Sequence, residues 1–273
     1  MITLKLSFTT LGCPDWSFEK IVEEARRMGF DGIEIRGVDG KMRAEEIPLF
    51  FPEDLEKTRA YFAENKLELV GFGTSASFHD PAGCDAAAEE GKAAIDVCSR
   101  AGIPFIRVFG DKIEDQNQRQ AVIDQVAKGI RVLCEYARGK NVDILLEIHG
   151  DFNTLESVLP LIEKLKDCPE FGILWDIEHS DRAYGDSWME FYGGIRPYIR
   201  HTHIKDHQRR GDDFELCLVG EGDIPIADIV KTLEADSYTG WYSLEWEKKW
   251  HPELPGPEVA LPGFLAYLAG IEK

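Results

Sequence analysis

The feature that most constrains the fold of this chain is a regular alternation of short apolar runs and amphipathic segments. Eight runs have the length and the Val, Ile, Leu and Phe content of strands, and they span residues 4–10, 32–36, 67–73, 104–110, 142–150, 171–179, 198–206 and 240–247. Most are apolar almost throughout, as parallel strands are when helices cover the sheet. The sequence therefore predicts a mainly parallel sheet.

Amphipathic segments with helical spacing separate these runs. They span residues 17–29, 52–65, 85–102, 119–139, 154–165, 186–195 and 225–235, and a last segment lies near 257–270. Pro262 is expected to interrupt that last helix. Helix ends are expected at Gly29, Gly102 and Gly139, where C-caps belong, and Pro225 is expected at a first helical position.

Eight strand–helix units in 273 residues match a (β/α)8 TIM barrel of the α/β class. We expect a single barrel domain over residues 1–273. An open doubly wound sheet is the alternative, but the first strand–helix turn, TTLGCPDWSF, lacks the G-x-G-x-x-G of a dinucleotide fold. Residues 206–223 are expected to form a long polar loop after the seventh strand, and such loops are usually functional.

Composition narrows the partners. The net charge of −19 disfavours a phosphate backbone as ligand, so DNA and RNA are not expected. No run of about 18 apolar residues and no signal peptide are found, which predicts a cytoplasmic protein with no membrane association. The six cysteines form no C-x-x-C pair and are expected to be reduced thiols.

Polar residues follow four successive strands of the predicted barrel. Catalytic residues of such barrels lie at the C-terminal strand ends, and these ends supply Glu147 and His149, Asp176 and His179, His201 and His203, and Glu245 and Glu247. A charged residue at the end of an apolar strand is costly unless it is paired or metal-bound. We therefore expect these side chains to converge at one side of the barrel mouth.

Three carboxylates and one imidazole suit a hard or borderline divalent cation. Such an ion would also relieve the repulsion of the three negative charges. His201 and His203 face the same way on a strand; His203 is expected to face the metal, and His201 to lie further down the strand or support the site. Alternatives remain open: Glu147 as a buried ion-pair partner, Asp176 as a helix cap, His203 as a core histidine and Glu245 as a structural group.

Several further residues are candidates for substrate contact. His149, His179 and Arg209 are each balanced between substrate contact and a supporting or surface role. His79 and Trp16 follow the third and first strands, where they would wall the pocket or pack loops. Lys205 is a candidate for phosphate or substrate binding, and the alternative is a solvated ion pair with Asp206.

Five motifs in order, LEIHG (146–150), WDIEHS (175–180), HTHIKD (201–206), VGEGDI (219–224) and GWYSLEWE (240–247), resemble the xylose isomerase-like barrel superfamily. The resemblance runs from the first strand to the eighth, and it is strongest to the sugar phosphate isomerase/epimerase group. It implies one divalent metal held by Glu147, Asp176, His203 and Glu245. Manganese is the expected ion, with magnesium, cobalt or zinc as alternatives.

The resemblance also implies roles in catalysis. In the similar ketose 3-epimerases the two metal-binding glutamates are the acid/base pair, here Glu147 and Glu245, and His179 and Arg209 match residues that contact the sugar. Those epimerases carry a further Glu where this chain has Asn153. This departure weakens the assignment to ketose 3-epimerisation.

The implied activity is isomerisation or epimerisation of a sugar or sugar phosphate through an enediolate. Loss of a β-hydroxyl from the same enediolate would give an inosose-type dehydratase. An apurinic-site endonuclease needs three metals and further histidines, and Phe109 stands where one of them would help. A sugar-binding barrel without catalysis is a third class. The expected partner is a small-molecule sugar or cyclitol, and a homo-oligomer is left open.

Overall fold

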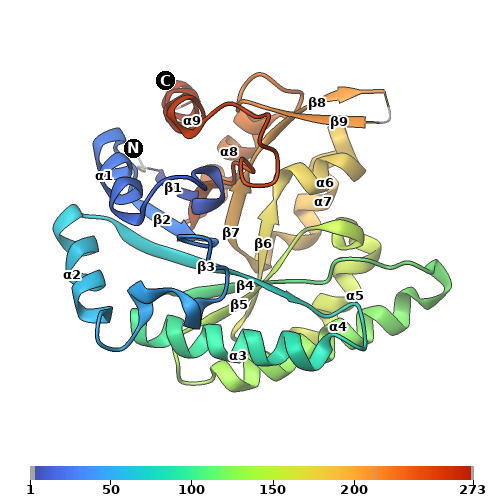
Figure 1. Ribbon diagram of the computed structural model, residues 1–273. Coiled ribbons are helices and arrows are strands. Elements are labelled where there is room, and N and C mark those ends of the chain that lie inside the picture. Colours follow the sequence, from blue (N-terminus) through green and yellow to red (C-terminus); the bar gives the residue numbers. More distant parts are fainter. Residues whose placement is uncertain (1–3, 212, 272–273) are drawn as a thin grey trace.

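Eight parallel strands close into one barrel in the computed structural model, which describes residues 4–211 and 213–271 (Figure 1). In ring order the strands are β1 (Lys5–Thr9), β10 (Trp241–Leu244), β7 (Ile199–Ile204), β6 (Phe171–Asp176), β5 (Asp143–Glu147), β4 (Phe105–Phe109), β3 (Glu68–Ser77) and β2 (Gly32–Ile35). Every neighbouring pair is parallel. The predicted TIM barrel and its eight strands are confirmed.

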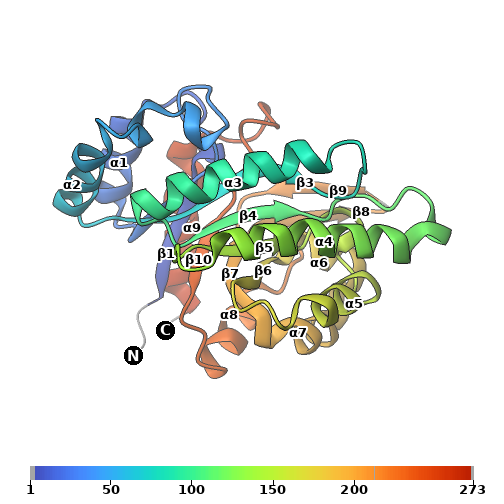
Figure 2. The same ribbon diagram turned by 90° about the horizontal axis from the view of Figure 1, so that it is seen from below.

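Helices cover the outside of the barrel, and α3 and α4 run side by side along it (Figure 2). The α-helices are α1 (Phe18–Met28), α2 (Leu55–Asn65), α3 (Cys84–Ala101), α4 (Arg119–Ala137), α5 (Leu155–Leu165), α6 (Ile177–Tyr184), α7 (Trp188–Ile195), α8 (Ile226–Ala235) and α9 (Pro257–Ile271). Short 3-10 turns span Thr10–Gly12, Ala44–Glu46, Pro48–Phe50, Gln116–Gln118, Gly150–Phe152, Gly185–Ser187 and Arg196–Tyr198.

Local signals explain most helix ends. Gly29 and Gly102 have positive φ values of 96° and 77° and end α1 and α3, as predicted. The helix before Gly139 ends two residues earlier, at Ala137. Pro225 precedes α8 and does not begin it.

Two further expectations about element boundaries are wrong. Pro262 does not interrupt α9, because the buried side chains of Leu261, Phe264 and Leu268 hold the helix against the barrel on both sides of it. The sixth strand ends at Asp176 and not at residue 179, since the chain turns there into α6.

The expected polar loop at 206–223 contains an antiparallel hairpin of β8 (Asp206–Arg210) and β9 (Asp213–Cys217). It stands beside α6 beyond the end of β7 (Figure 1). The Asp206 carboxylate organises this segment by accepting the backbone N–H groups of residues 207, 220, 222 and 224. Asp206 is buried, so the solvated ion pair with Lys205 is also wrong.

The barrel interior changes from apolar to polar along its axis. A small cluster of Val70, Phe105, Leu145, Leu174 and Trp241 comes from five strands and is separate from the main core between strands and helices. His201 stacks on Phe105, with ring centroids 4.7 Å apart, and begins the polar layer. The apolar cluster thus forms the floor beneath the polar residues of the barrel mouth.

All six cysteines are free, as expected for reduced thiols. None of the helices in the described part of the chain has the length and apolar content needed to cross a membrane.

Candidate active site

Four residues at successive strand ends meet in the barrel mouth. Glu147 ends β5, Asp176 ends β6, His203 lies on β7 and Glu245 follows β10. Each offers one ligand atom, and these atoms all lie within 4.8 Å of one another. All four side chains are buried. The convergence predicted from the strand ends is therefore confirmed.

The donor set fits a divalent cation. Glu147 Oε2, Asp176 Oδ2 and His203 Nδ1 are all buried. The three carboxylates of the set repel one another, and a divalent cation would relieve that repulsion. Three carboxylates with one imidazole are ligands of magnesium, manganese or zinc rather than of a soft metal.

Glu34 on β2 orients the imidazole of His203 across the barrel. His203 Nε2 lies 3.0 Å from Glu34 Oε1, and because the carboxylate can only accept, Nε2 donates and Nδ1 is left as the ligand atom. Hydrogen bonds of this kind, from the far nitrogen of a ligand histidine to a carboxylate, fix its tautomer and orientation. His201 Nε2 and Ser243 Oγ each lie 2.9 Å from the second carboxylate oxygen of Glu34, Oε2. His201 thus supports the site through Glu34, as expected.

Asp176 has two separate roles in the geometry. Its Oδ1 accepts the N–H groups of Glu178 and His179 and caps α6, so the reading of this residue as a helix cap is also correct. Its Oδ2 points to the other three ligand candidates. Burial, opposed by the Lys205 charge and reinforced by Glu245 and Glu147, raises the pKa of Asp176 to about 7.

Lys205 is buried at the centre of the carboxylates. Its Nζ lies 2.8 Å from Asp176 Oδ2, 2.7 Å from Glu245 Oε2 and 2.6 Å from Glu247 Oε1. Burial disfavours the ammonium, but these three carboxylates raise the pKa of Lys205 well above its ordinary value. The residue is therefore a fixed positive charge beside Glu245.

Arg107 on β4 is the fixed charge beside the other glutamate. Its Nε lies 2.9 Å from Glu147 Oε2, and its guanidinium stacks over Phe109 with Cζ 4.0 Å from the ring centroid. Burial raises the pKa of Glu147, yet the charge of Arg107 and the contact with His203 bring that pKa down to about 2. Glu147 is consequently an anion at neutral pH.

An aromatic and imidazole wall stands beside the ligands. His149 packs between Phe109 and His179, with ring centroids 4.9 and 4.2 Å away and ring planes tilted by 57° in both pairs. Burial, together with the Lys205 charge, lowers the pKa of His179 to about 3, so its ring is neutral. His79 accepts or donates at Ser77 Oγ, 2.8 Å away, and its Nδ1 lies 3.9 Å from Asp111, which also faces His149.

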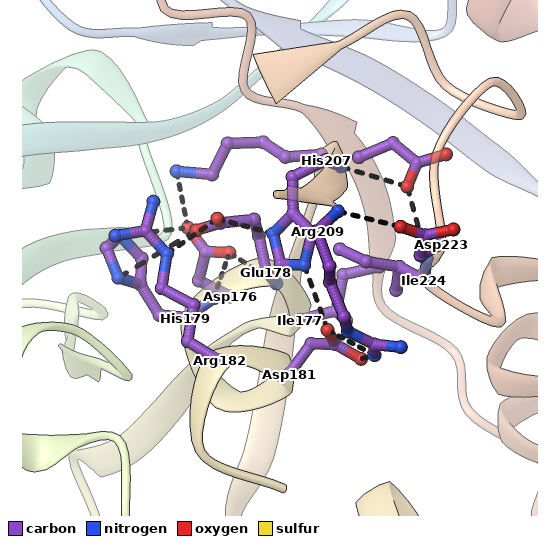
Figure 3. Close-up of polar contacts among 12 residues, drawn as sticks. Asp176, Ile177, Glu178, His179, Asp181, Arg182, His207, Arg209, Asp223 and Ile224 are labelled. Atoms are coloured by element: carbon purple, nitrogen blue, oxygen red, sulfur yellow. Dashed lines mark hydrogen bonds and ion pairs between the residues drawn. The ribbon is translucent and has the colours of Figure 1, made fainter. Parts of the chain in front are cut away.

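Two other substrate-contact candidates, Arg209 and Trp16, make their contacts with residues other than the four ligand candidates. Arg209 Nη2 donates to both oxygens of Asp181 on α6, at 2.8 and 2.9 Å (Figure 3). Trp16 is buried and lines a small cavity with Arg36 and Thr10. Their contact with substrate remains a prediction, but Arg209 is already engaged in joining the hairpin to α6.

His207, at the base of the hairpin, joins the same junction (Figure 3). Its Nδ1 lies 2.8 Å from Glu178 Oε1 and its Nε2 lies 3.0 Å from Asp181 Oδ2. Arg182 also binds Glu178 Oε1, at 2.7 Å. This junction fastens the hairpin to α6, the helix whose first turn Asp176 caps.

Sequence reasoning missed Glu34, Arg36 and Arg107. A signal was present, because each is a charged residue inside a run otherwise composed of strand residues, GIEIR for the first two and PFIRVFG for the third. All three are buried. Their alternation with apolar residues places them on the inner face of the barrel, where a charge needs a partner or a ligand.

Known proteins resemble this chain both in sequence and in structure. It is 26% identical over 70% of its length to the 3-dehydroshikimate dehydratase of Bacillus anthracis, and the match spans 66% of that enzyme, just under two thirds. It is 20% identical to the fructoselysine 3-epimerase of Shigella flexneri, over 89% of this chain and 90% of the epimerase. The relatives therefore include both a dehydratase and an epimerase.

Solved structures share the barrel. The IOLI protein, in a structure with a zinc atom, superposes with a TM-score of 0.81 at 18% identity over 98% of each chain. A xylose isomerase-like TIM barrel protein from Mycobacterium smegmatis in complex with magnesium gives a TM-score of 0.66 at 17% identity, over 89% of this chain and 90% of that one. These likenesses support the fold.

The model of one family, described as xylose isomerase-like TIM barrel, matches residues 22–264 and so covers seven of the eight barrel strands completely. This match agrees with the closed barrel. The chain belongs to the xylose isomerase-like TIM barrel family.

Proposed function

We propose that this protein is a divalent-metal-dependent enzyme that acts on a polyhydroxylated carbonyl compound, as a sugar or sugar phosphate isomerase or epimerase. The observation that carries the proposal is the meeting of Glu147 and Glu245 with Asp176 and His203 inside 4.8 Å. This set combines a cation site with two carboxylates able to transfer protons.

Glu147, Asp176, His203 and Glu245 would hold the ion. A divalent cation bound there would polarise the substrate carbonyl and stabilise negative charge on its oxygen. Manganese is our first expectation, and the structural relatives with zinc and magnesium keep those ions as alternatives.

Glu147 and Glu245 are suited to opposite halves of a proton transfer. They come from β5 and β10, which β6 and β7 separate in the ring, so they approach a substrate from different directions. Glu147, kept ionised beside Arg107, removes the proton next to the carbonyl. Glu245 takes up a proton from solvent and returns it to the opposite face or to the adjacent carbon, which gives epimerisation or isomerisation respectively, and Glu147 releases the proton it removed to solvent.

The remaining charged groups complete the chemistry. Lys205 is a fixed ammonium 2.7 Å from Glu245 Oε2, and its positive charge would stabilise negative charge that develops on an enediolate oxygen. His149 and His179 stack beside the ligands, where they would pack against the substrate and donate to its hydroxyl groups.

A dehydratase is the second candidate. Removal of the same proton followed by loss of a β-hydroxyl group gives an elimination, with a histidine of the wall as the acid. Two observations favour it: the similarity to a dehydratase over 70% of the chain, and Asn153 in place of the epimerase Glu. Asn153 Nδ2 donates to the backbone oxygen of His179, 3.0 Å away, which is a structural contact.

Solvent exchange in D₂O tests the proton-transfer pair. Metal-loaded protein should be incubated with a panel of ketoses, aldoses and cyclitol ketones, and the proton next to each carbonyl followed by NMR. We expect exchange with at least one substrate, and losses of about 10²–10⁴-fold in Glu147→Gln and Glu245→Gln. Glu163→Gln, at an exposed position on α5, is the matched control.

Two outcomes would count against this assignment. Exchange that persists in both Gln variants with metal bound would shift the base to His149 or His179. A product one water lighter than the substrate, detected by mass spectrometry, would favour the dehydratase over the isomerase.

A further inference from the structure

The barrel mouth carries its four ligand candidates on one side and two buried arginines on the other. The strands β5, β6, β7 and β10 are consecutive in the ring and carry the four ligand candidates. The strands β2, β3 and β4 form the opposite arc, side by side in Figure 1, and carry Arg36 just after β2 and Arg107 on β4. A substrate in the mouth would therefore meet carboxylates on one side and guanidinium groups on the other.

These two arginines are buried but incompletely paired. Arg36 is 8% exposed and Arg107 is 2% exposed. Arg36 Nη2 donates to Ser75 Oγ at 3.0 Å, and among the described residues neither Arg36 Nη1 nor Arg107 Nη1 has a hydrogen-bond partner. Buried guanidinium N–H groups without acceptors are costly, so an acceptor on a ligand would stabilise these two groups.

β3 is shaped to bring the two side chains together. A Cβ atom at Gly73 would lie 2.6 Å from Arg36 Cδ and 2.7 Å from Arg107 Nη2, so both arginines pack directly over this glycine. Burial and the charge of Arg107 lower the pKa of Arg36 to about 10, although the charges of Glu245, Glu147 and Glu90 act in the opposite direction. Like charges held this close disfavour each other, and a bound anion would relieve that repulsion.

Resting on the proposed function, we propose that the substrate carries a carboxylate and that Arg36 and Arg107 bind it while its carbonyl lies toward Glu147 and Glu245. Guanidinium groups match the planar carboxylate with paired hydrogen bonds. Charge favours a carboxylate over a phosphate monoester. Arg107 is already paired with Glu147, which leaves one positive charge, on Arg36, to balance the ligand.

The need to neutralise Glu147 would explain why Arg107 is buried here, but it applies to Arg107 only. It does not explain Arg36, whose hydrogen bond is to a neutral hydroxyl group. It also does not explain why both arginines bury an Nη1 atom that has no hydrogen-bond partner among the described residues. Arg36 is therefore the residue on which the test should be made, because it does not contact any of the four ligand candidates in the described structure.

Calorimetry with matched ligand pairs tests the inference. The pairs are D-glucuronate with D-glucose, and quinate with myo-inositol, and D-glucose 6-phosphate is the phosphate probe. Each is titrated into manganese-loaded and into chelator-treated protein. We expect at least one carboxylate to bind about tenfold or more tightly than its neutral partner, in both preparations.

Variants test whether Arg36 causes the preference for the carboxylate ligand over its neutral partner. Arg36→Gln should reduce it to within about twofold and Arg36→Lys should retain part of it, because lysine keeps the charge but not the paired geometry. Arg59→Gln, an exposed arginine on α2, should behave as wild type. Metal content of Arg36→Gln should stay unchanged, since Arg36 is not a ligand candidate.

Each other result overturns the inference. These results are equal binding of acids and neutral partners, tighter binding of the phosphate, a preference present only with metal, or a preference retained in Arg36→Gln. Failure of the wild type to bind a divalent ion would instead refute the proposed function. The measurement on chelator-treated protein would still test whether the arginines bind a carboxylate.

Discussion

The His207 junction predicts a loss of stability at alkaline pH. His207 is fully buried between Glu178 Oε1, at 2.8 Å, and Asp181 Oδ2, at 3.0 Å. Burial lowers the pKa of His207, but its hydrogen bonds to these carboxylates outweigh burial and raise that pKa from 6.5 to about 9. The folded protein therefore binds this proton more tightly than the unfolded chain does.

The sign and size follow from linkage. A raised pKa in the folded state contributes stability that is fully present below about pH 6.5 and is lost as the pH rises through 9. The difference between 6.5 and about 9 corresponds to roughly 3 kcal/mol, at 1.36 kcal/mol for each pKa unit. This is a substantial part of the total stability of a domain, which is about 5–15 kcal/mol.

Urea unfolding between pH 6 and pH 10 measures the effect. The free energy of unfolding of the wild type should fall relative to that of His207→Gln by up to roughly 3 kcal/mol over this range. Subtracting the two curves removes the contributions of thiols and lysines to the free energy of unfolding, because these groups titrate in both proteins. His251→Gln, at an exposed histidine, is the control and should keep the wild-type slope. Parallel curves for wild type and His207→Gln would refute the reasoning.

Three further predictions concern the mouth. The wild type should bind about one divalent ion per chain, and His203→Ala should lose most of it. Glu34→Gln should weaken zinc binding by about 10–100-fold, since Glu34 orients His203. Unchanged metal content in the first variant and unchanged affinity in the second would contradict the site. Gly73→Ala should cost about 1–3 kcal/mol in urea unfolding, because its Cβ would lie 2.6 Å from Arg36 Cδ, and a neutral result would mean that the arginines can move apart. Metal-loaded protein should not incise abasic-site DNA; incision lost in Glu147→Ala would reverse the ranking of functions.

Both the sequence and the structure argue against a nuclease. The net charge of −19 repels a phosphate backbone. Among the described residues, the only potential ligand group besides the four candidates is Glu34, His201 and His203, whose atoms already bind one another. Phe109 stacks on His149 at the place where a further histidine would be useful.

Local patterns were sufficient for the barrel and for the four ligand candidates. Apolar runs and helical spacing report burial within a few residues, so all eight strands could be located from the sequence. Because parallel strands end at the same side of a barrel, Glu147, Asp176, His203 and Glu245 could also be expected to meet. Such patterns were weaker at boundaries, as at α6, where one residue, Asp176, both ends a strand and caps a helix.

Only the tertiary structure decided which side chains meet across the barrel. Glu34 and His203 are 169 residues apart and Arg107 and Glu147 are 40 apart, and no local period connects either pair. Their contacts depend on closure of the ring, which sets the strands that face each other. Burial of Lys205 and folding of the hairpin have the same origin, since charged residues that read as solvated acquire partners only from distant strands and helices.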